Sequence, residues 1–97
     1  MLSLEVVLIM NKLEQARLII NEVDLKMIEL FKERMKAAEM VAEYKKENNL
    51  PVLDKAREEA LINKNVSYLN DKELEKYYLT FLEGMLTASK DYQKDLM

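Results

Sequence analysis

Apolar residues recur at helical spacing through the first half of the chain. Between residues 13 and 47 there is neither Gly nor Pro, and two apolar rows run three residues apart. In heptad notation the first row holds Leu13, Ile20, Met27, Arg34 and Val41, and the second holds Ala16, Val23, Leu30, Ala37 and Tyr44. This spacing predicts one helix of about 35 residues, about 50 Å long.

Local signals mark the end of this helix and the start of the next one. Residues 48–51 read Asn-Asn-Leu-Pro. Pro51 disfavours helical geometry at Leu50, and Asn tolerates the left-handed conformation that closes helices, so the long helix should end here. Asp54 then stands where a helix N-cap is expected, which predicts a second helix over residues 54–65.

A third helix is predicted after a sequence that resembles a capping box. Residues 70–73 read Asn-Asp-Lys-Glu, and we expect a helix from there to about Asp95. Gly84 lies inside this helix, where glycine costs about 1 kcal/mol relative to alanine. We therefore expect close packing at Gly84.

The lengths of these helices predict an oligomer. A helix of about 50 Å cannot bury its apolar face against two shorter helices of the same small chain, so a second copy is the simplest partner. The expected fold is all-α, with three helices, one very long, in an intertwined homodimer. Residues 13–97 are expected to form a single domain.

Residues 1–12 are expected to be an N-terminal extension of uncertain role. The first ten residues hold an apolar run from Val6 to Met10, no basic residue and no small-residue cleavage site. The run is too short to span a bilayer. Met10 is a plausible alternative start, and the other interpretation is an extra helix or a dimer contact.

Composition narrows the class of protein. One Gly and one Pro exclude a sandwich or barrel, which needs a turn about every 8–12 residues. With 49% apolar and 34% charged residues, the chain is typical of a globular protein, and we expect a cytoplasmic one without membrane partners. The lack of Cys and His excludes disulfides, the usual zinc sites and Cys or His catalysis. A net charge of −3 without a basic block argues against nucleic acid as a partner.

The arginines are the first candidate binding residues. Twelve of the fifteen basic residues are Lys, and the three Arg are Arg17, Arg34 and Arg57. A guanidinium matches carboxylates and phosphates in a way that Lys cannot. Arg34 occupies an apolar row, so we expect it to point inward and to need an anion. Lys45 shares its face about 16 Å along the helix. Either the two enclose a small anion, or Arg34 forms a buried ion pair with an acidic residue of another helix.

Two shorter polar groups lie on the other predicted helices. The second helix carries Asp54, Arg57 and Glu58 on one face, and the third carries Ser89 and Gln93 one turn apart. By themselves both spacings are typical of solvent-exposed helix surfaces. Arg17 lies about 25 Å before Arg34 along the long helix, so only Arg17 of a partner subunit can reach the same small ligand.

Taken together, the polar positions of all three predicted helices form one set. The set comprises Arg17, Asp24, Arg34, Lys45, the run Pro-Val-Leu-Asp-Lys-Ala-Arg-Glu at residues 51–58 and the run Ser-Lys-Asp-Tyr-Gln at residues 89–93. Its spacing resembles the all-helical chorismate mutase family over roughly residues 13–93. The family's fold, three helices in an intertwined dimer with two sites, agrees with the architecture predicted above.

The resemblance implies which residues hold the reacting part of chorismate. Each site would take Arg17 from the partner subunit and its other residues from one chain. Arg17 and Arg34 would bind the two carboxylates, with Ser89 assisting on the ring side. Lys45 and Gln93 would hydrogen-bond the ether oxygen of the breaking bond.

The resemblance also implies the remaining wall of the site. Glu58 and the backbone of Asp54 would hold the ring hydroxyl, and Arg57 would support the pocket wall. Val41 and Met85 would provide apolar contact to the ring. Among these assignments, those on the third helix are the least constrained, because the sequence there contains little motif to fix the register of Ser89 and Gln93.

The implied chemistry suits a chain without Cys or His. The rearrangement of chorismate to prephenate is an intramolecular [3,3] shift that needs no proton transfer, nucleophile, metal or cofactor. It is accelerated by holding the compact conformer and by stabilising negative charge on the ether oxygen. The sequence therefore predicts a dimeric chorismate mutase in the branch that leads to phenylalanine and tyrosine.

Two other functions remain open at this point. One is a lyase of the same fold that eliminates pyruvate from isochorismate, although residues 54–58 and Gln93 look more like the mutase. The other is a non-catalytic, mutase-like dimerisation or regulatory module. No segment of the sequence identifies a partner enzyme of the same pathway.

Overall fold

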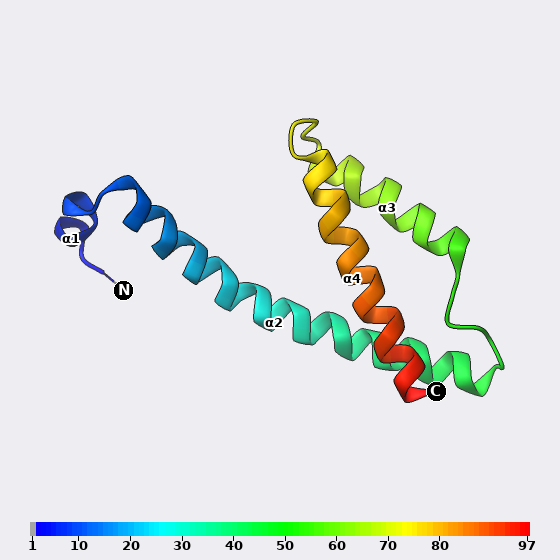
Figure 1. Ribbon diagram of the computed structural model, residues 1–97. Helices are drawn as coiled ribbons and strands as arrows, with labels where there is room; N and C mark the ends of the chain where they lie inside the picture. The colour runs from blue at the N-terminus through cyan, green and yellow to red at the C-terminus, as the bar shows by residue number, and fades with distance from the viewer. Residues whose placement is uncertain (1) are drawn as a thin grey trace. The chain divides into compact units, whose positions relative to one another are not determined.

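A computed structural model describes residues 2–97, whose regular elements are all helices (Figure 1). They are α1 (Leu4–Ile9), α2 (Lys12–Glu47), α3 (Lys55–Leu69) and α4 (Glu75–Leu96). The all-α prediction is confirmed, and the long helix and the two shorter helices lie close to their predicted positions. The sequence predicted three helices, and the fourth, α1, lies in the segment expected to be an extension.

The chain forms two compact units, one ending at Arg34 and the other comprising Met35–Met97, and α2 contributes to both. None of the helices described for residues 2–97 has the length and apolar character needed to cross a lipid bilayer.

Asn11 begins α2 in the first unit. Its side-chain oxygen accepts a hydrogen bond from the backbone N–H of Glu14 at 2.8 Å, and its side-chain nitrogen donates to the Glu14 carboxylate at 3.1 Å. Asn is among the best N-cap residues because this bond satisfies a backbone donor that the helix leaves free. The sequence analysis did not identify this cap.

Large apolar side chains of α2 stay exposed within this unit of the single chain. They are Leu13, Ile19, Ile20, Val23, Leu25, Met27, Ile28, Leu30 and Phe31. Long helices in proteins owe most of their stability to burial of one apolar face rather than to helix propensity. The apolar rows of α2 therefore form a surface that one copy of the chain leaves open to solvent.

In the second unit, α2 ends in a Schellman motif. The backbone N–H of Leu50 donates to the Lys45 carbonyl at 2.8 Å, and that of Asn49 to the Lys46 carbonyl at 3.5 Å. Asn49 has a φ of 54°, in the left-handed region that Asn tolerates. The predicted end of the long helix is confirmed, and the motif places Lys45 in its last turn.

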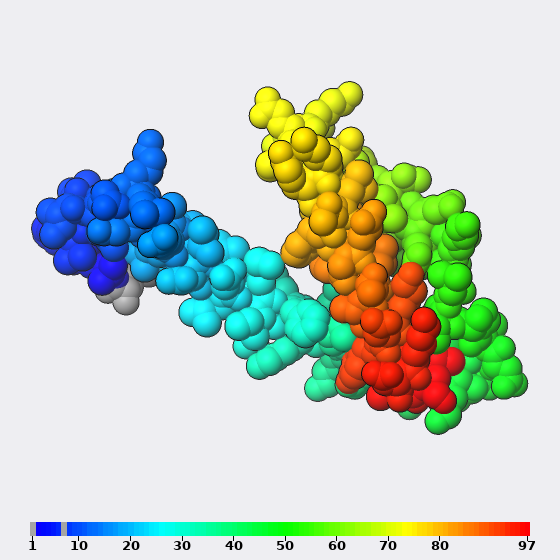
Figure 2. All heavy atoms as spheres, viewed as in Figure 1, coloured from blue at the N-terminus to red at the C-terminus, as the bar shows by residue number. Residues whose placement is uncertain are grey.

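Helices α3 and α4 pack side by side in the second unit (Figures 1 and 2). The predicted N-cap is confirmed, because the Asp54 carboxylate accepts a hydrogen bond from the Arg57 N–H at 3.0 Å. Helix α3 ends at the left-handed Asn70, whose N–H donates to the Val66 carbonyl at 3.2 Å. It runs four residues beyond the predicted end at Asn65.

Helix α4 does not begin with the predicted capping box. Asn70 closes α3 instead, and the Asp71 carboxylate accepts hydrogen bonds from the backbone N–H groups of Glu73 and Leu74, at 3.0 and 3.2 Å, in a turn before the helix. The first helical residue is Glu75, and Leu74 provides no side-chain cap. One acidic side chain therefore stabilises the connecting turn rather than the first turn of α4.

The prediction of close packing at Gly84 is wrong for the single chain. A Cβ atom at Gly84 would meet no atom within 4 Å, and the residue is exposed. Among the residues whose side chains the structure describes, the buried apolar ones are Ala38, Ala42 and Leu82. These few buried side chains lie on α2 and α4, and Gly84 is not among them.

Candidate active site

Two narrow helix faces meet in the second unit. Leu82, Ser89 and Gln93 are buried on α4, and at about 100° per residue they lie within about 40° of one another around the helix. Ala38 and Ala42 are buried on α2, and the half-buried Lys45 continues the same stripe. The small alanine side chains leave room there, so the polar ends of Lys45 and Gln93 approach each other.

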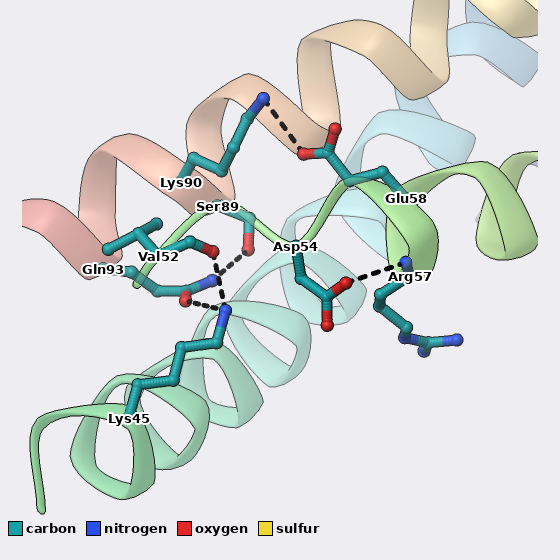
Figure 3. A network of polar contacts seen from close by, with 8 residues as sticks. All are labelled: Lys45, Val52, Asp54, Arg57, Glu58, Ser89, Lys90 and Gln93. Atoms are coloured by element: carbon teal, nitrogen blue, oxygen red, sulfur yellow. Dashed lines mark hydrogen bonds and ion pairs between the residues drawn. The ribbon is translucent and has the colours of Figure 1, made fainter. Parts of the chain in front are cut away.

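Lys45 lies at the centre of a polar network (Figure 3). Its ammonium donates to the Val52 carbonyl at 2.7 Å and lies 3.5 Å from the side-chain oxygen of Gln93. The first contact is a strong, charge-assisted hydrogen bond, and the second is at the long limit. Lys45 therefore joins the last turn of α2 to the α2–α3 connection and to α4.

Gln93 and Ser89 extend the network into the core. The Gln93 amide nitrogen donates to the Ser89 hydroxyl at 3.3 Å, and the two residues are only 7% and 8% exposed. Buried polar groups need partners, and no buried side-chain N or O atom of the described residues lacks one. Lys45, Gln93 and Ser89, all expected in the site from the sequence, are thus brought together.

The start of α3 carries the acidic residues of the predicted site. The Asp54 carboxylate is occupied by its cap bond to the Arg57 N–H, and the guanidinium of Arg57 is exposed and points away from Lys45 (Figure 3). Glu58 is half-buried, and its carboxylate lies 3.0 Å from the Lys90 ammonium of α4. Arg57 is therefore not part of the network around Lys45, and Glu58 is linked to α4 through Lys90.

The other predicted residues are not joined to this network by any hydrogen bond or ion pair of the described residues. Met85 is half-buried on α4, one turn before Ser89, and Val41 is 43% exposed on α2. Arg34 is half-buried in the first unit rather than buried as expected, and Arg17 is exposed. Among residues 2–97 neither arginine forms an ion pair, so the acidic partner that one of the two alternatives required for Arg34 is not found there.

A second polar link between α4 and α2 was not predicted. The Tyr92 hydroxyl donates a hydrogen bond to the Glu39 carboxylate. This hydrogen bond, followed by partial desolvation and the charge of Glu39, raises the pKa of Tyr92 above its ordinary value of 10.0. Tyr92 directly precedes Gln93 in α4, and both side chains make polar contacts with α2.

Comparison with known protein families identifies the family of the chain. The family model of chorismate mutase type II matches residues 16–94. The chain belongs to this family. The resemblance inferred from the sequence is thereby confirmed, and the match contains every residue of the network around Lys45. No curated protein and no solved structure matches the chain.

Membership of the chorismate mutase type II family implies chorismate as substrate and an isomerase reaction. The groups around Lys45 are consistent with that chemistry. They comprise one ammonium, one amide and one hydroxyl, which bind and orient polar atoms and stabilise negative charge without acting as nucleophiles.

An open depression of about 320 Å³ lies beside the network rather than within it. It is lined by Glu39, Ala42, Glu43, Lys46 and Leu96. Lys45 and Gln93 do not line this depression, although Ala42, which shares the buried stripe of α2 with Lys45, does. The depression is therefore not the candidate site of this chorismate mutase family member.

Proposed function

We propose that the chain catalyses the rearrangement of chorismate to prephenate. In this reaction the ether C–O bond breaks while a new C–C bond forms within the same molecule, and no proton is transferred. The observation that carries the proposal is the convergence of the Lys45 ammonium and the Gln93 amide in a member of the chorismate mutase type II family.

Lys45 and Gln93 act on the ether oxygen in this proposal. An ammonium has three donors, of which Val52 and Gln93 occupy up to two, so one remains for the substrate. As the C–O bond lengthens, negative charge grows on the oxygen, and a fixed cationic donor stabilises it more than it stabilises bound chorismate. The amide of Gln93 turns from Ser89 to supply a second, neutral donor.

The carboxylates of chorismate are assigned to arginines. Arg34 binds one carboxylate and Arg17 of the partner subunit binds the other, with Ser89 assisting near the ring. Arg17 and Arg34 are seventeen positions apart in α2, about 25 Å along the helix, which supports the need for a second chain. Neither arginine has an ion-pair partner among residues 2–97, so both can accept an anion.

The remaining residues position the ring. Glu58 and the backbone of Asp54 hold its hydroxyl, while Arg57 supports the wall of the site. Val41 and Met85 make apolar contact with the ring. Together these contacts hold the compact conformer in which the two reacting carbons meet, which is an orientation effect.

We further propose that the enzyme is an intertwined homodimer with two shared sites. The exposed apolar rows of α2 support this, because a second copy is the simplest partner that can cover a face of such length. In this proposal residues 13–97 form one chorismate mutase domain and residues 1–12 an extension. The enzyme would act in the cytoplasm, on the route to phenylalanine and tyrosine.

The test is identification of the product formed by the purified chain. Chorismate and isochorismate are supplied separately, and prephenate, pyruvate and aromatic products are quantified. We expect prephenate from chorismate at a catalytic rate and no pyruvate from isochorismate. Pyruvate released from isochorismate would assign the chain to lyase chemistry, and a folded chain that converts neither substrate would be a non-catalytic, mutase-like module.

A further inference from the structure

An ion pair joins α3 to α4 beside the network of Lys45. The Lys90 ammonium lies 3.0 Å from Oε1 of Glu58, and their side chains are 31% and 23% exposed. The other ion pair of the described residues, Lys32 with Glu29, is 3.7 Å long between side chains that are 67% and 73% exposed. Water screens an exposed pair strongly, whereas the shorter, partly desolvated pair of Lys90 and Glu58 is less screened.

Lys90 and Ser89 are neighbours in α4 but point to different helices. Ser89 lies on the buried stripe with Gln93, which faces Lys45, and Lys90 is turned about 100° from it, toward α3 (Figure 3). Helix α4 thus presents the hydrogen-bonding groups of Ser89 and Gln93 to α2, and the ammonium of Lys90 to the first turn of α3. Any shift of α4 would move both sets together.

We propose that Lys90 is a positioning residue that fixes the carboxylate of Glu58 for the ring hydroxyl of the substrate. This inference rests on the proposed function. A carboxylate has about four acceptor positions, and Lys90 takes one at Oε1, which leaves Oε2 and further lone pairs for the hydroxyl. The ammonium also restricts the rotamers that the Glu58 side chain can adopt.

Lys90 also compensates the negative charge of Glu58, which would otherwise repel the substrate. Chorismate carries two carboxylates, so an uncompensated Glu58 carboxylate in the same site repels it. Without Lys90 the substrate should bind more weakly. The ether oxygen contacts of Lys45 and Gln93 are unchanged, so the chemical step should change little.

The experiment compares Lys90→Met, Lys90→Arg and the matched control Lys94→Met, an exposed lysine one turn later in α4. Each is assayed with chorismate and with an analogue whose ring hydroxyl is replaced by hydrogen. For Lys90→Met we expect a KM for chorismate about fivefold higher, kcat within about twofold, and a smaller rise in KM for the analogue, which loses the charge compensation but has no hydroxyl for Glu58 to hold. Lys90→Arg should restore the KM because it keeps the ion pair, and Lys94→Met should match wild type.

Other outcomes overturn the inference in distinguishable ways. If wild type converts chorismate and Lys90→Met has the same KM, Lys90 has no positioning role while the proposed function stands. An equal loss with chorismate and with the analogue would mean that Lys90 does not fix Glu58 for the ring hydroxyl, and acts only through its charge or by joining the helices. A wild-type chain that leaves chorismate unconverted overturns the proposed function and this role together. Circular dichroism of every variant separates these results from misfolding.

Discussion

The ammonium of Lys45 lies 3.5 Å from the side-chain oxygen of Gln93, although the two residues are 48 positions apart in the sequence. Two local features create this approach. The Schellman motif places Lys45 in the last turn of α2, and the buried alanines before it let α4 come close. In the proposed mechanism, this approach places the Lys45 ammonium and the Gln93 amide at the ether oxygen of chorismate, where negative charge develops.

Replacing Lys45 with alanine should abolish most catalysis while leaving the fold intact. Its contact with the ether oxygen acts mainly in the transition state, and loss of one such donor costs about 10²–10³-fold in kcat, with a charged donor at the upper end or beyond. Loss of the bond to Val52 should lower the melting temperature by only several degrees.

The matched control for this variant is Lys46→Ala, the exposed neighbour of Lys45 on another face of α2. Its kcat should equal that of wild type. A Lys45→Ala enzyme within tenfold of wild type would remove Lys45 from the mechanism.

Activity should be nearly independent of pH between about 5 and 8, because Gln93 does not titrate. In a Gln93→Glu variant only the protonated carboxyl group can donate to the ether oxygen. Its activity should therefore fall about tenfold for each unit of pH above the pKa of the new group. Rate measurements across this range test both expectations, and a steep profile for the wild type would show that another group titrates.

Much of the fold could be predicted because its signals are local. Helical spacing defined α2, the Asp54 cap defined the start of α3, and residues 48–51 defined the end of α2. The start of α4 was misplaced because Asn70 is used to close α3, a choice that depends on the conformation of the turn. Spacing alone also gave no sign that Gly84 lies beside open space.

The site was less predictable because it depends on how the helices pack. The spacing of Ser89 and Gln93 is typical of an exposed surface, and only the family resemblance pointed to a buried role. The partner of Glu58 was missed altogether. Its pairing with Lys90 depends on the register between α3 and α4, which neither helix encodes by itself.

The exposed apolar surface of α2 gives a test of the dimer. Leu30 is 62% exposed in the single chain, so Leu30→Glu should shift the melting temperature of a monomer by no more than a few degrees. If a second chain covers Leu30, the buried carboxylate should lower the melting temperature by about 10 °C or more and favour monomers in sedimentation.

Lys32→Glu is the control for this substitution. Lys32 lies about 160° around the helix from Leu30, and its pair with Glu29 is solvent-exposed. This variant should melt and sediment as wild type does. Equal behaviour of the two variants would argue against a partner on the face of Leu30.

The Tyr92–Glu39 hydrogen bond should make the fold sensitive to alkaline pH. The pKa of Tyr92 is higher in the folded state than in the unfolded state, so the unfolded state loses the proton first. The bond therefore contributes stability below the ordinary pKa of 10.0, which is lost as pH rises through the higher folded pKa. The melting temperature should decrease less between about pH 9 and pH 11 in Tyr92→Phe than in wild type. An identical decrease in the two proteins would show that the bond does not affect stability.

Refolding two inactive variants together tests the shared site most directly. Arg17→Ala and Lys45→Ala chains are unfolded, mixed in equal amounts and refolded, and chorismate turnover is measured. In a mixed dimer one site receives an intact Arg17 and an intact Lys45, so about a quarter of wild-type activity should return. A mixture of Lys45→Ala and Gln93→Ala, which belong to the same chain's half of each site, should stay inactive. Activity no higher than that of the two variants refolded separately would contradict a chorismate mutase site built from two chains.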